Sequence, residues 1–353
     1  MSLANRIADR IRSEGPLPVS DYMADCLMHP QWGYYARQDP FGSGGDFITA
    51  PEISQMFGEM VGLCLAQCWM DQGQPKRIAL AEAGPGRGTM MADILRATRA
   101  VPGFHAAVSL HLVETSPTLR RMQNEALRDH APVWHDAVQD LPQGMPLFLV
   151  ANEFLDALPI RQFLRGDTGW HERCVGLEGD RLCFGLAPEM PQPGLAHRLE
   201  DTRPGDLVEM CPQAPAIAEA IGQRIARHGG AALFIDYGDW RSVGDTFQAL
   251  RDHAYVDPLS EPGSADLTAH VDFEILAQAT PSAFSRLTPQ GVFLERLGIT
   301  ARAQTLARGR QAAEVDAIAT AHRRLTHPEE MGNLFKVLGF FPESANPPPG
   351  LDT

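Results

Sequence analysis

The feature that most constrains the fold is a glycine-rich loop that joins an apolar run to a helical pattern. The apolar run lies in a predicted strand at residues 77–82, and the helical pattern covers residues 88–99. Between them, the loop has Gly84, Pro85, Gly86 and Gly88. Glycines allow the backbone to turn tightly and allow a ligand to approach it closely. Such a loop can also be a plain tight turn. Its position after the first strand of an α/β sheet predicts a nucleotide-binding site.

The spacing of the glycines separates two kinds of cofactor. A dinucleotide fingerprint requires a third glycine at position 89, where this chain has Thr89. An acidic residue followed by glycines at alternate positions is instead the pattern of class I S-adenosylmethionine-dependent methyltransferases. We therefore expect S-adenosylmethionine as the cofactor, with Glu82 facing its cationic methionine part.

Two further acidic residues end the next strands in the chain. Glu114 follows the apolar run 107–113, and Asp136, with Ala137 after it, follows the short run 132–135. A carboxylate can accept hydrogen bonds from both hydroxyls of a ribose, so Glu114 is predicted to bind the cofactor ribose. Asp136 and Ala137 are predicted to contact the adenine. The alternative for Glu114 and for Asp136 is a carboxylate that is exposed to solvent and binds no ligand.

Alternating strands and helices dominate the first half of the chain. Apolar runs at 146–151 and 231–236 continue the rhythm, and it predicts a parallel sheet flanked by helices. Residues 161–186 are typical of an inserted β-meander, and residues 272–326 are mostly helical in pattern, before a last strand at 333–340. The predicted fold class is α/β, a class I (Rossmann-like) methyltransferase fold with an inserted β-meander and extra helices.

Composition narrows the possible partners. The 353 residues carry a formal net charge of −14, which argues against a nucleic-acid partner. No run approaches the roughly 20 apolar residues of a membrane span, and no spacing of the six cysteines indicates a metal site, so we expect no metal. The N-terminal residues resemble neither a secretory signal nor a transit peptide, which predicts a cytoplasmic, bacterial protein.

Seven longer segments carry motifs of one family. They are Gly33–Tyr35, Gly45–Ser54, Phe57–Glu59, Glu82–Thr89, Asn152–Pro159, Ile235–Gly238 and Asp266–Phe273. Together they resemble the MidA-like methyltransferases, which include the mitochondrial complex I assembly-factor methyltransferase. The resemblance covers nearly the whole chain, and Ala83 is a departure where a larger apolar residue is expected.

The resemblance implies methylation of a protein arginine, forming symmetric dimethylarginine on a core subunit of respiratory complex I and supporting its assembly. We divide the chain into six expected parts. These are an N-terminal helical extension (1–45), a first core part (46–159), a β-rich substrate subdomain (160–210), a second core part (211–271), a helical substrate region (272–330) and the final strand with the tail (331–353).

Candidate catalytic residues follow from the chemistry of a guanidinium acceptor, which carries its charge at neutral pH. Carboxylates can hold it through paired hydrogen bonds, so Glu153 is the first candidate and Asp156 the second. Asn152 is predicted to cap a helix or to touch the cofactor, and His270 to accept a proton or orient the substrate. Acidic residues at a helix N-terminus explain Glu153 and Asp156 equally simply.

The segment 45–54 is predicted to close over the cofactor as a lid, shaped by Thr49 and Pro51, unless it is an ordinary loop before a helix. Three other functions compete with the arginine methyltransferase. An assembly chaperone with a vestigial cofactor site is disfavoured by the intact loop, and a small-molecule methyltransferase needs neither the meander nor the helical region. A nicotinamide oxidoreductase lacks the required glycine spacing.

Overall fold

The computed structural model describes residues 2–37 and 49–353. The residues 45–48 of the predicted lid lie outside this range, whereas Thr49 and Pro51 lie within it. The chain divides into two compact units, which we describe one at a time. Unit 1 comprises Met1–Phe47, Asp156–Ala214 and Trp240–Asp272, and unit 2 comprises Ile48–Leu155, Pro215–Asp239 and Phe273–Thr353.

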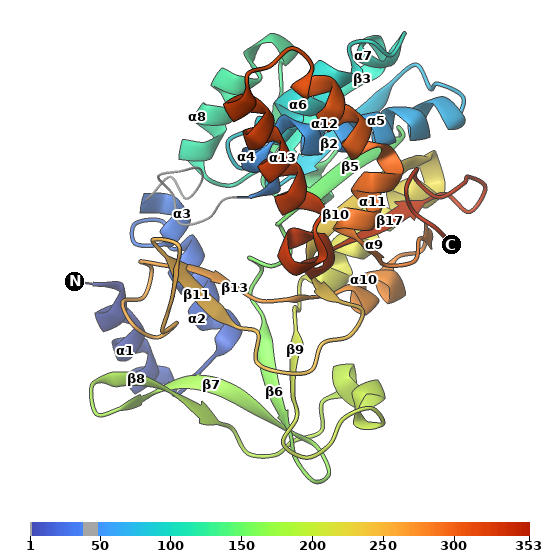
Figure 1. The fold of residues 1–353 in the computed structure, drawn as a ribbon. Helices are drawn as coiled ribbons and strands as arrows, with labels where there is room; N and C mark the ends of the chain where they lie inside the picture. The colour runs from blue at the N-terminus through green and yellow to red at the C-terminus, as the bar shows by residue number, and fades with distance from the viewer. Residues whose placement is uncertain (1, 38–48) are drawn as a thin grey trace. The chain divides into compact units, whose positions relative to one another are not determined.

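Unit 2 is built on a twisted mixed sheet with the strand order β15-β17-β10-β5-β2-β3-β4. The strands from β10 to β4 run parallel, as the alternating pattern predicts. β2 and β5 are buried along their whole length, which explains their unbroken apolar runs. Their bounds are β2 Ile78–Ala83, β3 Val108–Val113, β4 Val133–His135, β5 Leu147–Asn152, β10 Gly230–Asp239, β15 Ala283–Phe284, β16 Thr288–Pro289 and β17 Phe335–Phe341 (Figure 1).

The last strand differs from the simplest reading of the rhythm. β17 runs antiparallel to β10, with Val337 opposite Ile235, and β15 and β16 pair antiparallel with β17. The region 272–326 therefore contains two short strands besides its helices. A chain that returns to the sheet after a helical excursion of this length can approach from either direction, so periodicity alone does not settle the strand's direction.

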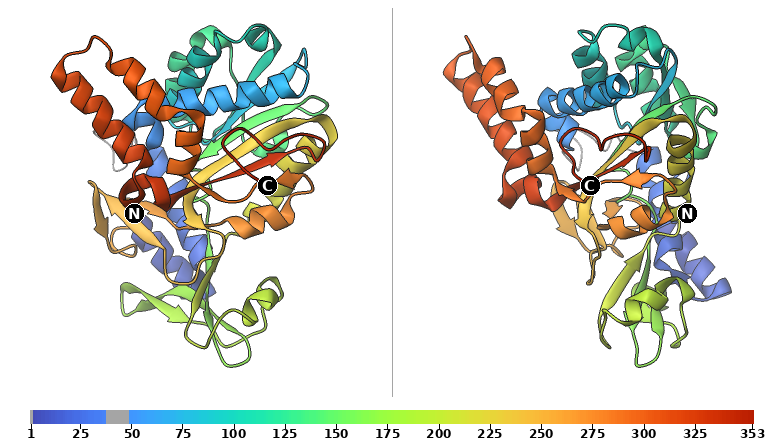
Figure 2. Two further views of the ribbon diagram at one scale, coloured as in Figure 1. Left: turned by 45° about the vertical axis from the view of Figure 1, so that its right-hand side comes forward. Right: turned by 90° about the vertical axis from the view of Figure 1, so that its right-hand side faces the viewer.

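The helices of unit 2 are α4 Ala50–Ile53, α5 Gln55–Asp71, α6 Thr89–Thr98, α7 Phe104–Ala107, α8 Pro117–Ala126, α9 Ala214–His228, α10 Phe273–Ala279, α11 Gln290–Leu297, α12 Ile299–Ala307 and α13 Ala312–Thr326. Among them, α6 lies within the predicted range 88–99, and α10 to α13 lie in the predicted helical region. The orange helices α12 and α13 lie side by side in Figure 1 and in both views of Figure 2. Among the described helices, none is long and apolar enough to cross a membrane.

The apolar spacing over residues 53–69 predicts one continuous helix, but the structure interrupts it at its start. Ser54 is extended, with φ −163° and ψ 138°, and its hydroxyl accepts a hydrogen bond from the Met56 N–H, so α5 begins after it. Along α5, Gly58 and Gly62 face α6, where a Cβ on Gly58 would lie 2.7 Å from Asp93 Cβ. The two helices consequently pack at a distance that larger residues would prevent.

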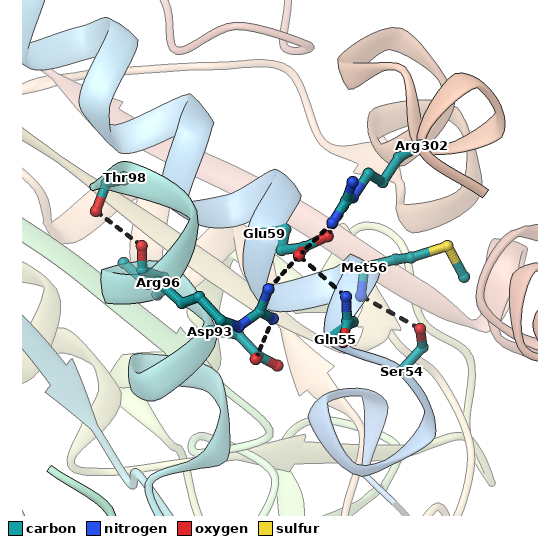
Figure 3. Close-up of polar contacts among 9 residues, drawn as sticks. Ser54, Gln55, Met56, Glu59, Asp93, Arg96, Thr98 and Arg302 are labelled. Carbon is teal, nitrogen blue, oxygen red and sulfur yellow. Dashed lines mark hydrogen bonds and ion pairs between the residues drawn. The ribbon is translucent and has the colours of Figure 1, made fainter. Parts of the chain in front are cut away.

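An ion cluster around the buried Glu59 joins α5 to α6 and α12. Glu59 is 3% exposed, and its carboxylate accepts from Arg96 at 2.6 Å and from the Arg302 Nε at 2.7 Å (Figure 3). Although burial opposes it, the two guanidiniums lower the pKa of Glu59. Because the sheet-side helix α5 is tied to α12 in this way, the cluster fixes the start of the α12–α13 pair against the core.

We predict that removing both guanidiniums destabilises the protein more than removing them together with the Glu59 charge. The Arg96→Met/Arg302→Met variant should lose about 3 kcal/mol, because it leaves Glu59 buried and unpaired, with a discount for the partly exposed arginines. The pKa of Glu59 is lower in the folded protein than its ordinary value. The stability from the ion pairs is therefore present at a pH above the ordinary pKa and is lost as the pH falls through the folded pKa. Urea unfolding at neutral and acidic pH measures both effects.

The control adds Glu59→Gln to the double variant. Glutamine removes the buried charge, so the triple variant should recover a large part of the lost stability. A triple variant as unstable as the double one would contradict the explanation through Glu59 and leave side-chain packing or the lost Arg96–Asp93 ion pair as the cause.

Unit 1 combines the N-terminal helices with the meander. Its main sheet has the order β1-β7-β6-β9, with β8 paired to β7, and all of these pairs are antiparallel. A second sheet has the order β12-β11-β13. The elements are α1 Leu3–Glu14, β1 Leu17–Pro18, α2 Val19–Met28, α3 Tyr34–Arg37, β6 Arg161–Arg165, β7 Trp170–Glu178, β8 Arg181–Leu186, β9 Leu207–Met210, β11 Gln248–Arg251, β12 Ala254–Val256, β13 Asp266–Thr268 and β14 Val271–Asp272.

The core of unit 1 brings distant segments together. Ile7 of α1 and Tyr22 of α2 pack in one cluster with Val175 of β7 and Leu267 of β13. The segment 240–271, which we assigned to the second core part, is therefore grouped with the N-terminal helices and the meander. The finer six-part division stays a prediction.

Candidate functional site

The glycine-rich loop leaves the carboxyl end of β2 and leads into α6. Gly84, Gly86 and Gly88 have φ values of 68°, 52° and 84°, in the left-handed region that favours glycine. A Cβ on Gly84 would also lie 2.9 Å from the Phe154 ring. The Pro85 carbonyl accepts from the Gly88 N–H at 2.7 Å, which closes a tight turn. The loop conformation thus depends on all three glycines.

Glu82 lies on β2 directly before this loop. It is 2% exposed, and among the described residues its Oε2 has no hydrogen-bond partner. Burial raises the pKa of Glu82 to about 8. A buried carboxylate with an unsatisfied oxygen suits a cationic group, so the observation fits the ammonium of the methionine part of S-adenosylmethionine.

Glu114 follows β3 and is fixed by its neighbours. Its carboxylate accepts from the Ser116 N–H at 2.8 Å and from Gln123 Nε2 at 3.2 Å. Burial raises the pKa of Glu114, while these hydrogen bonds act in the opposite direction. The carboxylate therefore stands at the strand end, where its predicted role is binding the ribose hydroxyls.

Gln123 is a residue of this site that the sequence analysis missed. It is fully buried on α8, and its amide also donates to the Gly86 carbonyl at 2.8 Å and accepts from Trp134 Nε1 at 2.8 Å. It therefore joins the glycine loop, Glu114 and β4. The available signal was its spacing, four residues after Leu119 and four before Leu127, on the apolar stripe of the helix.

Asp136 follows β4 and is exposed. It forms an ion pair with Arg120 at 2.6 Å, and Arg120 also donates to the Glu114 carbonyl at 2.7 Å. The ion pair holds the ends of β3 and β4 together. Ala137 is the next residue, before a short 3-10 helix, Val138–Asp140. The adenine contact of Asp136 and Ala137 stays a prediction.

Asn152 and Glu153 end β5 in an uncommon backbone conformation. Glu153 has φ 48°, which is rare for a residue with a side chain and is typical of functional sites. Its Oε1 accepts from Asn152 Nδ2 at 3.0 Å and from the Ala50 N–H at 3.1 Å. Asn152 Oδ1 is buried and has no hydrogen-bond partner in the described part of the chain. The strand end thus presents a positioned carboxylate and a spare amide oxygen.

The start of α4 is attached to this strand end and to the cofactor loop. Besides the Ala50 contact with Glu153, Glu52 accepts from the Thr89 hydroxyl at 2.6 Å, at the first turn of α6. The structure therefore brings Thr49 and Pro51 to the same region as Glu153. Their predicted role in a lid remains a prediction, since it includes residues outside the described range.

A second missed residue supports the turn after Glu153. Asp236 lies on β10 and is 1% exposed. Its carboxylate accepts from the Leu155 N–H at 3.0 Å and from the Tyr237 N–H at 3.0 Å. Because β10 is the parallel neighbour of β5, Asp236 can hold the chain as it leaves β5.

Asp156 and His270 belong to unit 1. The Asp156 carbonyl accepts from the Ala269 N–H at 3.0 Å, and the His270 N–H donates to the Thr246 hydroxyl at 2.8 Å. The motif at 266–273 predicts a polar loop before a helix, and this is wrong for its first residues, because Asp266–Thr268 forms β13. Within this unit, the Tyr35 hydroxyl donates to Asp266 at 3.2 Å, and burial with the charges of Asp266 and Asp156 raises the pKa of Tyr35.

The parallel sheet, the loop of three left-handed glycines and the acidic strand ends define a class I S-adenosylmethionine-dependent methyltransferase. The comparisons with known proteins agree. Residues 60–292 match the model of a family described as putative S-adenosyl-L-methionine-dependent methyltransferases, and the chain belongs to this MidA-like family.

Relatives and solved structures extend the match over the whole chain. The mitochondrial protein arginine methyltransferase NDUFAF7 of Xenopus laevis is 37% identical over 97% of this chain and 85% of its own length, and the human protein is 36% identical over 94% and 82%. A candidate methyl transferase from Burkholderia thailandensis, crystallised with S-adenosyl-homocysteine, has a TM-score of 0.85 at 31% identity and covers 99% of this chain and 92% of its own. The protein is an S-adenosylmethionine-dependent methyltransferase.

We predict that cofactor binding releases a proton from Glu82. Because the folded pKa of Glu82 is about 8, its neutral form predominates at neutral pH. The stability that the neutral carboxyl group contributes is lost as the pH rises from the ordinary pKa of a glutamate through about 8. A bound ammonium favours the ionised form. Calorimetry at about pH 6.5 in buffers of different ionisation enthalpy should show release of up to about one proton per cofactor.

Glu82→Gln provides the control, because the cofactor's own amine titrates in the same way with both proteins. The variant should lose the proton release attributable to Glu82 and bind the cofactor more weakly. Equal proton release by the two proteins would show that Glu82 stays neutral in the complex.

Proposed function

We propose that this enzyme is a protein arginine N-methyltransferase that forms symmetric dimethylarginine on a core subunit of respiratory complex I and supports its assembly. The relatives with 35–37% identity, which are named as protein arginine methyltransferases, support the acceptor class. The complex I subunit and the symmetric product rest on the motif resemblance. A cytoplasmic location remains a prediction. The relatives do not support it, since they are named as mitochondrial proteins.

The observation that carries the proposal is the carboxylate of Glu153 beside the cofactor loop. One of its oxygens is held by Asn152 and the Ala50 N–H, which fixes the orientation of the group. A guanidinium stays charged at neutral pH and pairs with a carboxylate through directed hydrogen bonds.

Two features of the chain would serve this reaction. When bound, S-adenosylmethionine supplies a methyl group on a sulfonium. The Glu153 carboxylate would orient one guanidinium nitrogen and stabilise its charge, and such positioning contributes much of the rate in a bimolecular transfer. The spare Asn152 Oδ1 is a second acceptor for the cofactor or the substrate.

The test is methylation of extracts from cells that lack this protein, using the purified enzyme and labelled S-adenosylmethionine. The expected product is one labelled band at a complex I core subunit, with symmetric dimethylarginine identified by mass spectrometry. A subunit that binds without gaining a methyl group would favour the chaperone function, and label found only in small molecules would favour a small-molecule acceptor.

A further inference from the structure

A recess of about 200 Å³ lies on unit 2 beside the C-terminal half of α9. Its polar and charged lining comes from two segments, α9 and the chain that precedes β5: Gln139, Gln143, Gln223, Arg224, Arg227 and His228. A water molecule takes up about 30 Å³, so the recess has room for a small oxyanion with some of its hydration.

The recess lies away from the residues of the cofactor site. Gln143 precedes the first residue of β5, and His228 precedes the first residue of β10. Gly84 and Asn152, by contrast, stand at the carboxyl ends of β2 and β5. Because these strands are parallel, the recess residues lie at the amino ends of the strands and the cofactor residues lie at their carboxyl ends.

Arg224 is the unusual member of this lining. It is 4% exposed, and its guanidinium donates to three backbone carbonyls, those of Ala220 at 2.8 Å, Gln139 at 2.7 Å and Leu141 at 3.2 Å. Its Nε is buried and has no hydrogen-bond partner among the described residues. No carboxylate within the described ranges lies within ion-pair distance of it. A buried guanidinium that has no carboxylate in direct contact is costly, and carbonyl dipoles offset this only in part.

Arg227 adds to the positive charge beside the recess. Arg227 and His228 lie on the last turn of α9 and are exposed. A cation at a helix C-terminus is common because it complements the dipole, which accounts for Arg227 but not for the buried Arg224. Burial lowers the pKa of Arg224, and the charge of the exposed Asp140 acts in the opposite direction.

We propose that this recess binds the phosphate group of a small ligand, either inorganic phosphate or a phosphorylated metabolite or amino acid. Arginine guanidiniums bind phosphate oxygens through paired, charge-assisted hydrogen bonds, and the glutamine amides supply neutral donors. On a chain with a formal net charge of −14, a site of this kind requires local positive charge, which Arg224 and Arg227 provide.

The test is a titration of the enzyme, saturated with S-adenosylhomocysteine, at constant ionic strength. Inorganic phosphate and O-phosphoserine are the two probes, chloride replaces them in the reference, and the melting temperature is measured. We expect a saturable rise with at least one probe, half-complete at a concentration on the order of millimolar. The probe that binds more tightly identifies the source of the phosphate group.

Arg227→Gln and Arg121→Gln are the matched variants. Both arginines are exposed, and Arg121 lies on α8, outside the recess. Arg227→Gln should raise the half-saturating concentration by at least about fivefold, and Arg121→Gln should leave it unchanged. The proposal would be overturned by a melting temperature that responds equally to chloride. It would also be overturned if Arg227→Gln responded to the probes as the wild type does.

Discussion

Replacing Glu153 by glutamine should lower the single-turnover rate of methylation at least about a hundredfold, or about 2.7 kcal/mol, while cofactor affinity stays within a few-fold. Glutamine keeps an oxygen that can accept from the Ala50 N–H and Asn152, so the start of α4 should keep its place. The lost charge is the one that would hold the guanidinium in the transferring state. The measurements are calorimetry for the cofactor and single-turnover kinetics on the recombinant subunit.

Two further variants separate charge from tethering. Glu125→Gln removes an exposed carboxylate of α8 and should have wild-type turnover. Glu153→Ala removes both the charge and the acceptor oxygen. If Glu153→Gln turned over at the wild-type rate and only Glu153→Ala were slow, Glu153 would serve to hold α4 and not to bind the substrate.

Valine at Gly86 should strongly weaken cofactor binding while the fold persists. Gly86 has φ 52°, a conformation that a β-branched residue adopts only with strain, and the side chain would enter the space next to the ligand. Its carbonyl also receives the Gln123 hydrogen bond that joins the loop to Glu114. We expect at least about a hundredfold weaker binding of S-adenosylmethionine, measured by calorimetry, or about 2.7 kcal/mol.

Gly144→Val is the matched control for strain without a ligand. Gly144 also has a positive φ, 77°, but a Cβ there would meet no atom within 4 Å. This variant should bind the cofactor as the wild type does. Unchanged affinity in a folded Gly86→Val variant would remove the loop from the cofactor site.

The sequence alone was sufficient for the features that depend on local order. The apolar run before Glu82, the alternate glycines and the acidic strand ends predicted the sheet, the loop and the cofactor class. The reason is that strand burial and positive φ impose residue choices within a few positions, so they are visible as a pattern. The helix break at Ser54 was missed, because its capping hydrogen bond fits an uninterrupted apolar period as well.

Only the tertiary structure decided which of these residues meet. Gln123 reaches the glycine loop across 37 positions in the chain, and Ala50 reaches Glu153 across 103. It also decided the antiparallel course of β17 and the placement of β13 with the N-terminal helices. Contacts between distant segments depend on how whole elements pack, and local propensity carries no record of that packing. The sequence by itself therefore determined the kind of site, and the packing decided how its side chains are held.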